Sequence, residues 1–345
     1  MRVMHIIGTL GVGGAEKVVL NLHNFIDGNI QSLVTCLTPE KAALETYDFP
    51  NSNINFFDLR IKNFFQQLSQ IILHIRRSKP DIIHAHMYHG LIISIFAKAF
   101  MPSVKIVFTS HNFLVGKTIL RKCIIFFTKP FRNIDIIFSK KQHRILNIRN
   151  SKVILNGVEP AIVKPKENIN KTNLKILTIG SHTHQKNFVN LVYEIADLLK
   201  SKNATLDIFG DGPLTSDIKE AIAQTGSERN IFLKGISSSI SRDMVEYDLF
   251  ILFSLYEGFP LVLLEAGMNK LPVLSTKVGA IDEILTDEHG WCVEHNNFKN
   301  ELSHIINQHE ERSKKAELFH KYVAQNCSVK AMVENHKKIY RELYE

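Results

Sequence analysis

Short β-branched runs alternate with stretches of helical periodicity along most of the amino-acid sequence. This alternation is typical of βαβ units, which build parallel sheets covered by helices. The first series of predicted strands covers residues 2–7, 31–37, 82–86, 105–109, 134–138 and 152–155. The second covers residues 175–180, 205–210, 230–233, 249–253 and 272–275, with helices at 187–200, 215–224 and 260–268. The sequence therefore predicts an α/β fold with two parallel sheets.

The two series are separated by a polar stretch that contains Gly157, Pro160 and Pro165, a composition typical of a linker. A chain of 345 residues is also long enough for two domains. We expect four parts in chain order: an N-terminal domain at 1–160, a linker at 161–172, a C-terminal domain at 173–328, and a helix at 329–345 that packs across the domain interface.

The composition excludes several classes of protein. Hydrophobic residues make up 45% of the chain and charged residues 22%, as in ordinary globular proteins. The four cysteines are scattered and match neither a disulfide framework nor a metal knuckle. We see no signal peptide and no apolar run of about 18 residues, so we expect a cytoplasmic protein.

Basic residues are concentrated in the first half of the chain. Residues 1–160 hold 20 lysines and arginines against 9 aspartates and glutamates, whereas residues 161–345 hold 22 against 25. Such a surface attracts phosphates of a nucleotide, a lipid headgroup or a nucleic acid. A nucleic-acid-binding protein is thus one alternative, although the basic residues are not interleaved with an aromatic stacking platform.

A glycine-rich turn, GVGGAEK at residues 11–17, follows the first predicted strand and opens a helix. Bare backbone amides at such a helix start can bind a phosphate. Glu16 stands where the dinucleotide fingerprint would need its last glycine, and no lysine–serine pair completes a P-loop. A purely structural turn is the alternative.

Two carboxylates flank the start of a predicted helix in the second half. Glu257 precedes Pro260, a residue that favours the first turn, and Glu265 lies about one and a half turns inside. Carboxylates at this spacing suit the hydroxyls of a ribose or hexose, and the amides of Leu261 and Val262 suit its phosphate. The alternative is a solvated glutamate with a helix-dipole partner.

Lys186 lies near a helix start, where its charge opposes the helix dipole. An anionic ligand would explain this position better than solubility. The turns at 209–214 and 233–235 are rich in glycine and follow later strands, at the edge where open α/β sheets bind ligands. Either turn could be only structural.

Histidines give a weaker signal. His84 and His86 share one face of a predicted strand, but no third ligand is identifiable, so we expect no metal site. His111 directly follows a strand and is better placed to contact a ligand.

Taken together and in order, these segments resemble the family 4 glycosyltransferases. Those are retaining enzymes of the GT-B fold, in which two Rossmann-like α/β domains face each other across a cleft, and they use nucleotide-sugar donors. The matching segments are Gly13-Gly-Ala-Glu16, Thr109-Ser-His-Asn112, residues 153–158, Lys186-Asn187, residues 210–213, residues 257–266 and residues 279–284.

The resemblance implies contacts of Glu265 with the ribose, Glu257 with the donor sugar and Lys186 with the diphosphate. It also implies that His111 contacts the donor sugar, and we take His111 and Glu257 as the catalytic residues. No cofactor or metal is implied. Ser181 departs from the family pattern, because an arginine commonly stands there on the diphosphate. From the resemblance and the helix-start amides together, we expect donor binding by Gly13, Gly14, Ser181, Lys186, Gly235, Ile236, Leu261, Val262 and Glu265.

The expected reaction is transfer of a hexose or N-acetylhexosamine from a nucleoside-diphosphate sugar, with UDP as the expected carrier, with retention of configuration. The acceptor would be a hydroxyl of a glycan or lipid-linked glycan, as in the biosynthesis of surface polysaccharides such as lipopolysaccharide. A nucleotide-sugar epimerase or hydrolase of the same fold is the alternative. The sequence identifies neither the base, the sugar, the acceptor nor the oligomeric state.

A predicted helix between residues 117 and 129 suggests peripheral docking on an anionic membrane surface at the inner face of the cytoplasmic membrane. We expect Leu120, Cys123, Ile124 and Phe127 to face the sheet. The opposite face would be basic with exposed apolar groups, as suits the headgroup boundary. Its residues are Lys117, Arg121, Lys122, Ile125, Phe126 and Lys129.

Overall fold

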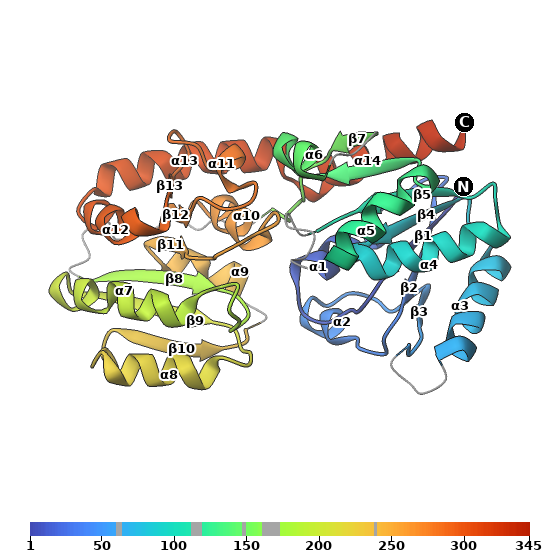
Figure 1. Ribbon diagram of the computed structural model, residues 1–345. Helices are drawn as coiled ribbons and strands as arrows, with labels where there is room; N and C mark the ends of the chain where they lie inside the picture. The colour runs from blue at the N-terminus through green and yellow to red at the C-terminus, as the bar shows by residue number, and fades with distance from the viewer. Residues whose placement is uncertain (60–63, 112–118, 147–149, 161–172, 238–239) are drawn as a thin grey trace. The chain divides into compact units, whose positions relative to one another are not determined.

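The computed structural model describes residues 1–345 apart from 60–63, 112–118, 147–149, 161–172 and 238–239, so the expected linker lies outside the described residues. The chain forms two compact units (Figure 1). The first consists of Met1–Gly157 together with Val329–Glu345, and the second of Val158–Ser328. Each unit is an α/β domain with one parallel sheet.

The first unit is built on a seven-stranded sheet in the order β3-β2-β1-β4-β5-β6-β7. Its strands are β1 (Arg2–Ile7), β2 (Gln31–Cys36), β3 (Ile54–Phe56), β4 (Ile82–His86), β5 (Lys105–Thr109), β6 (Ile134–Ile137) and β7 (Ser151–Val153). Its helices are α1 (Gly14–Phe25), α2 (Ala42–Thr46), α3 (Phe64–Ser78), α4 (Met87–Phe100), α5 (Ile119–Thr128), η1 (Lys129–Phe131), α6 (Lys140–Leu146) and α14 (Val329–Tyr344).

The second unit is built on a six-stranded sheet in the order β10-β9-β8-β11-β12-β13. Its strands are β8 (Leu174–Ile179), β9 (Ala204–Phe209), β10 (Ile231–Gly235), β11 (Leu249–Leu252), β12 (Val273–Thr276) and β13 (Trp291–Val293). Its helices are α7 (Phe188–Ser201), α8 (Thr215–Gln224), α9 (Ile240–Asp243), η2 (Met244–Glu246), α10 (Leu261–Met268), α11 (Ile281–Ile284), η3 (His295–Asn297), α12 (Phe298–Ile306) and α13 (His309–Asn326).

Both sheets are doubly wound, and the strand order reverses once in each. The reversal lies between β1 and β4 in the first sheet and between β8 and β11 in the second. Loops that leave the carboxyl ends of strands at such a point diverge and create a crevice, which is where open α/β sheets bind ligands. The topology therefore directs the search to the loops after these four strands.

The two faces of the first sheet have different coverings. Met4 and Ile83 belong to a buried cluster with Ile71 of α3 and Ile93 of α4. The alternate residues His5, His84 and His86 lie on the opposite face, where α14 contacts α1 and β4. The C-terminal helix is thus an integral part of the first unit.

Helix α5 is oriented differently from the sequence-based expectation. Ile125, expected to be exposed, is 4% exposed and packs in a cluster with Phe108. Phe127, expected to face the sheet, is 69% exposed, and Phe126 is 60% exposed. The run from Cys123 to Phe127 is apolar on every side, so its periodicity does not select the buried face. Lys117 lies outside the described residues, and the structure does not describe the side chains of Arg121 and Lys122.

Candidate active site

Two loops of the second unit meet at the reversal point of its sheet. One comprises residues 180–187 between β8 and α7, and the other comprises residues 253–260 between β11 and α10. The amide of Leu255 donates a hydrogen bond of 2.8 Å to the carbonyl of Gln185, and the side-chain amide of Gln185 donates one of 2.9 Å to the carbonyl of Tyr256. The loops are therefore joined by one hydrogen bond between main-chain groups and one from a side chain to the main chain.

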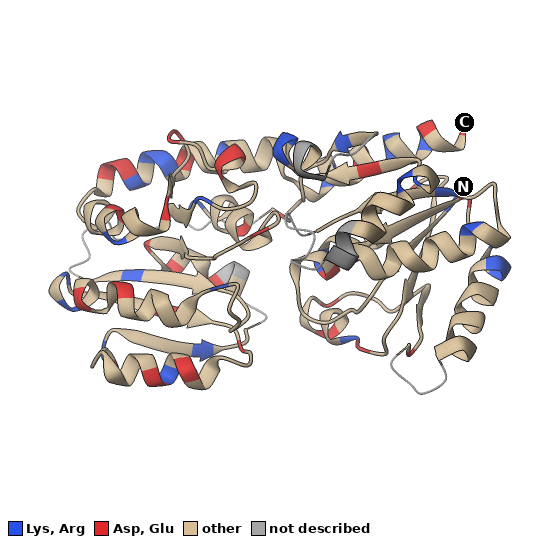
Figure 2. Cartoon of the chain, viewed as in Figure 1, with Lys and Arg blue, Asp and Glu red and all other residues tan. Residues whose placement is uncertain are grey.

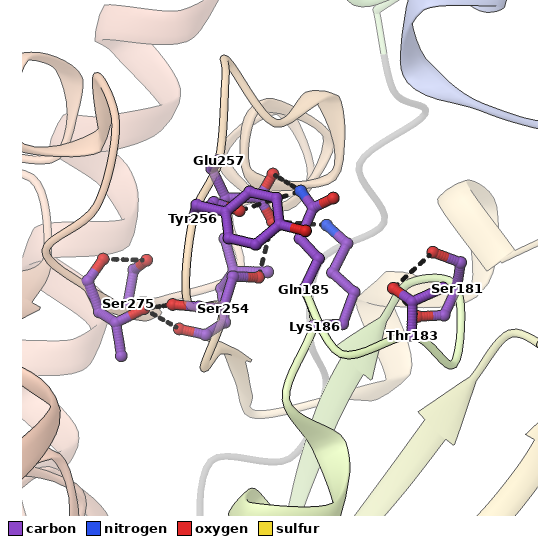
Figure 3. Close-up of polar contacts among 10 residues, drawn as sticks. Ser181, Thr183, Gln185, Lys186, Ser254, Tyr256, Glu257 and Ser275 are labelled. Atoms are coloured by element: carbon purple, nitrogen blue, oxygen red, sulfur yellow. Dashed lines mark hydrogen bonds and ion pairs between the residues drawn. The ribbon is translucent and has the colours of Figure 1, made fainter. Parts of the chain in front are cut away.

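Glu257 is the centre of the polar contacts between these loops (Figure 3). Lys186 Nζ lies 2.6 Å from Glu257 Oε1, and the Ser254 hydroxyl donates a 2.6 Å hydrogen bond to the same oxygen. Gln185 Nε2 reaches Oε2 at 3.4 Å. The Glu257 side chain is only 6% exposed, so these donors compensate the desolvation of its charge.

Glycines allow these loops to pack closely. Gly210 has a φ of +133°, and a Cβ there would lie 1.9 Å from the carbonyl oxygen of Gly180. Gly279 has a φ of +62°, and a Cβ there would lie 2.3 Å from the carbonyl oxygen of Glu257. Both positions require glycine for conformation and for space. The glycine at position 210, in the turn at 209–214, therefore has a structural explanation.

The start of α10 supplies further polar groups beside Glu257. Pro260 is the N-cap residue, so Leu261 and Val262 occupy the first turn, where the amides have no acceptor within the helix. Glu265 lies one turn further along α10 and is half-buried. Amide donors and two carboxylates are therefore grouped around one helix start, a combination able to bind a ligand with both phosphate and hydroxyl groups.

The remaining predicted residues of the second unit lie on exposed turns. Ser181 is exposed, and its hydroxyl lies 3.4 Å from that of Thr183. Gly235 ends β10 with a φ of +72°, and Ile236 beyond it is 64% exposed. The main chain accommodates this turn because the amide of Gly210 donates a 2.8 Å hydrogen bond to the carbonyl of Gly235.

In the first unit, Gly13 and Gly14 begin α1, with Gly13 as an extended N-cap. The Glu16 carboxylate folds back over Gly13. Burial, followed by the charge of Glu40, raises the pKa of Glu16 to about 7, against the lowering effect of a hydrogen bond to its own backbone amide. The side chain of Glu16 therefore partly fills this turn and binds one of its amides.

His111 follows β5 and is 8% exposed. Its Nε2 lies 3.0 Å from Nδ1 of His86. Burial lowers the pKa of His111 to about 3, with a smaller contribution from His336, so the ring is neutral at pH 7. Its environment is a group of histidines, which its sequence position alone does not indicate.

His5 supplies the third histidine that the sequence analysis did not find for His84 and His86. Nitrogen atoms of the three buried rings lie within 4.8 Å of one another. The register that aligns His5 with His84 depends on strand order, so local sequence gives no signal for it. The sequence analysis also missed Ser254 and Gln185. Both lie close in the sequence to Glu257 and Lys186, and this proximity could have identified them as site residues.

Family models match almost the whole chain. The model for glycosyl transferases group 1 matches residues 161–326, and the model for glycosyltransferase family 4 matches residues 12–160. The chain is a family 4-like glycosyltransferase. The expectation from the seven sequence segments is thereby confirmed.

Two curated relatives of this glycosyltransferase are named as N-acetylhexosamine transferases. A Staphylococcus aureus poly(ribitol-phosphate) alpha-N-acetylglucosaminyltransferase is 30% identical over 34% of this chain, a match that spans only 25% of the relative. A Campylobacter jejuni transferase of N-acetylgalactosamine to a diphospho-undecaprenol-linked saccharide is 22% identical over 84% of this chain and 85% of its own.

Solved structures show the same fold. Anabaena HepE in complex with UDP-glucose superposes with a TM-score of 0.85 at 18% identity, over 99% of this chain and all of the other. A mutant of Staphylococcus aureus TarM superposes with a TM-score of 0.81 at 14% identity, over 100% of this chain and 99% of the other. The chain therefore has the GT-B fold of two Rossmann-like domains, as predicted.

Proposed function

We propose that this glycosyltransferase transfers a hexose or N-acetylhexosamine from a UDP-sugar to a hydroxyl of a glycan or lipid-linked glycan, with retention of configuration. The observation that carries the proposal is the buried contact of Lys186 with Glu257 beside the first turn of α10. This contact groups one cation, one carboxylate and the first-turn amides of α10 near the reversal point of the sheet. Open α/β sheets bind ligands at such a point. The UDP-glucose complex of HepE supports a nucleotide-sugar donor, and the names of the two relatives support poly(ribitol-phosphate) or a diphospho-undecaprenol-linked saccharide as the kind of acceptor.

The diphosphate is assigned to Lys186 and to the amides of Leu261 and Val262. The ammonium of Lys186 has three N–H donors, so it can bind an arriving diphosphate while one donor stays on the buried carboxylate of Glu257. When the bond to the sugar breaks, negative charge grows on the leaving diphosphate, and these preorganised donors stabilise it without a metal ion. The exposed hydroxyl of Ser181 contributes at most a neutral hydrogen bond there.

The two carboxylates have separate roles in this proposal. Glu257 accepts hydrogen bonds from the donor sugar, because Ser254 and Gln185 already fix its position. We assign Glu265 to the ribose, and the turn of Gly235 and the exposed Ile236 to the base. The resemblance to the family assigns His111 of the first unit to the donor sugar, and Gly13 and Gly14 to the diphosphate. Catalysis then depends on positioning and charge stabilisation.

We also propose that the acceptor is bound to a membrane. Helices α3, α4 and α5 contact one another in sequence, and none of the three contains an aspartate or glutamate. Figure 2 shows few charged residues along α3 and α4. Exposed phenylalanines follow this surface instead, namely Phe64, Phe65, Phe96, Phe100, Phe126, Phe127 and Phe131.

Lys129 Nζ lies 5.1 Å from the centroid of the Phe126 ring, at the end of α5. Aromatic side chains with a nearby cation suit the boundary between lipid headgroups and acyl chains. Among the described residues, no helix is long and apolar enough to span a bilayer. We therefore assign this phenylalanine surface to peripheral contact with an anionic membrane, in place of the basic face expected from the sequence.

The test is incubation of the full chain with a panel of UDP-sugars, first alone and then with lipid-diphosphate-linked saccharides. Thermal shift identifies the donor, and mass spectrometry identifies the product. Growth of the acceptor by one sugar, with an anomeric configuration matching the donor by NMR, supports the proposal. Free sugar or an altered UDP-sugar formed at the same rate without acceptor would instead show a hydrolase or an epimerase.

A further inference from the structure

Three histidine rings in the first unit form a continuous hydrogen-bonded chain. Nδ1 of His5 lies 3.0 Å from Nε2 of His86, and Nδ1 of His86 lies 3.0 Å from Nε2 of His111. His5 and His86 are fully buried, and His111 is buried at the end of β5. This hydrogen-bonded chain of rings therefore runs from the buried strands at the β1–β4 reversal point to His111, beyond the end of β5.

The sheet register builds this chain. His5 of β1 is aligned with His84 of β4, and His86 lies two residues further along the same face. His86 is aligned in turn with Thr109 of β5, so His111 comes two residues beyond it, again on that side. Three histidines from distant parts of the sequence thus follow one another across the end of the sheet.

His84 belongs to a separate pair of contacts. Its Nδ1 lies 2.6 Å from the Tyr340 hydroxyl and its Nε2 lies 2.7 Å from the Thr109 hydroxyl. Hydroxyls both donate and accept, so His84 is satisfied in either tautomer. A metal held by His5, His84 and His86 would have to displace several of these hydrogen bonds, and we therefore favour a hydrogen-bonded role for the group.

Burial lowers the pKa of His5, His86 and His111, which makes all three rings neutral at pH 7. A neutral ring has one N–H and one bare nitrogen, so the two hydrogen bonds of the chain must run in the same direction. We call the direction from the buried His5 toward His111 outward. In this direction, Nδ1–H of His5 donates to Nε2 of His86, and Nδ1–H of His86 donates to Nε2 of His111. His111 then carries its own proton on Nδ1.

The inward direction is disfavoured at His5. It would place a proton on Nε2 of His5, which is buried and has no hydrogen-bond partner among the described residues. A buried N–H without an acceptor is rarer in proteins than an acceptor left without a donor. The outward direction leaves only a bare nitrogen at this position. The buried end of the chain thus determines the tautomer at its other end.

We propose that His86, backed by His5, is a positioning residue that holds His111 as the Nδ1–H tautomer, with an N–H to offer to the donor sugar. The proposal rests on the role of His111 in the proposed function. It assigns no proton transfer and requires no co-reactant. It adds two residues to the active site that do not touch the substrate.

The direct test is NMR of the full chain with ¹⁵N-labelled histidine, whose long-range ring correlations distinguish the two neutral tautomers. The His111 signals are assigned by their loss in His111→Asn. We expect Nδ1–H for His111 in the wild type and a change to Nε2–H or a mixture in His86→Phe, which keeps a ring without nitrogens. His86→Asn retains an N–H donor near the Nδ1 position, so it should restore the Nδ1–H tautomer of His111. It can also be measured if His86→Phe does not fold.

Tyr340→Phe is the matched control, because it removes a buried hydrogen bond of His84 and leaves the chain from His5 to His111 intact. We expect it to keep the His111 tautomer and the turnover of the wild type. In His86→Phe the kcat should fall about tenfold, with unchanged calorimetric affinity for UDP and partial recovery in His86→Asn. Equal losses of kcat in His86→Phe and Tyr340→Phe would overturn the positioning role in favour of a structural one.

Two further results would also overturn the proposal. One is an Nε2–H tautomer of His111 in the wild type, or an unchanged tautomer in His86→Phe. The other is a shift of the His5 and His86 signals on addition of stoichiometric Zn²⁺, which would indicate a metal site. Unchanged turnover in His111→Ala would instead contradict the proposed contact of His111 with the sugar, so the two failures appear in different measurements.

Discussion

The ammonium of Lys186 lies 2.6 Å from a carboxylate oxygen of Glu257, and both side chains are largely buried. Each residue came from a different sequence motif, and the two motifs follow the two strands that flank the reversal point of the second sheet. The pair gives the proposed donor site a cation that is held in place before the donor arrives. This preorganisation reduces the cost of ordering a long lysine side chain on binding.

Replacement of Lys186 by alanine should weaken UDP binding by about ten- to a hundredfold, because a charge-assisted hydrogen bond contributes roughly 1.5–3 kcal/mol. Isothermal titration calorimetry with UDP measures this loss. Lys175→Ala is the control, since that lysine lies on β8 of the same unit but away from the loop. Equal affinities of the wild type and Lys186→Ala would exclude the diphosphate contact.

Replacement of Glu265 by glutamine should weaken binding of UDP and of the UDP-sugar alike, because both ligands contain the ribose. Glu257→Gln should leave UDP affinity nearly unchanged and lower turnover of the UDP-sugar, because the sugar is present only in the donor. The measurements are calorimetry with UDP and steady-state kinetics. Identical behaviour of the two variants would contradict the separate assignments.

Replacement of Gly210 by alanine should destabilise the second unit by about 3 kcal/mol or more, because the new methyl group overlaps the main chain at a strained φ. Gly226→Ala is the matched control: its φ is +58°, but the nearest atom to a Cβ is 4.0 Å away. It should lose only about 1 kcal/mol. Urea unfolding of both variants measures the combined cost of the overlap and of a φ of +133°, which is less accessible to alanine than +58°, and equal losses would refute both.

The double substitution of Phe126 and Phe127 by serine should reduce sedimentation with anionic vesicles, because it removes two exposed aromatic rings from α5. Phe25→Ser provides the control, because Phe25 is similarly exposed but lies on α1. Vesicles of phosphatidylcholine alone should bind the wild type more weakly than vesicles that contain phosphatidylglycerol. Binding of the double variant at the wild-type level would rule out this surface.

The sequence allowed prediction of both sheets and of the Glu257 and Lys186 motifs, since strand periodicity and helix-start signals are local. The three-residue strands β3 and β13 were missed, because so short a run carries little periodicity, although β7 of the same length was predicted at 152–155. The buried face of α5 was predicted wrongly for a similar reason: its central run is apolar on all sides. Local sequence patterns identify helices and strands, but which face of a helix is buried depends on the elements that pack against it.

The histidine group shows the same limit for a site. His84 and His86 were recognised as sharing a face, yet their partners come from a strand that begins the chain and from the helix that ends it. Those contacts depend on strand order and on the return of α14 to the first unit. Tertiary neighbours of this kind are fixed by the whole fold and have no signature in a local window.

His336 should make the protein less stable in acid. Burial lowers its pKa to about 4, although a hydrogen bond to Met332 opposes the shift, whereas an unfolded histidine has a pKa near 6.5. The unfolded state therefore binds more protons below pH 6.5, and the free energy of unfolding falls as the pH falls. For this one residue the loss between pH 8 and pH 5 is about 2 kcal/mol.

Replacement of His336 by phenylalanine removes this proton uptake while a ring still fills the site. The difference in unfolding free energy between the wild type and His336→Phe should therefore shift by about 2 kcal/mol in favour of the variant between pH 8 and pH 5. Other titrating groups contribute equally to both proteins, so they cancel in this difference. Glu16 is one of them, and because its pKa is raised, it lowers the free energy of unfolding as the pH rises. Urea unfolding at several pH values measures the difference. Parallel curves over this range would show that His336 titrates alike in the folded and unfolded states.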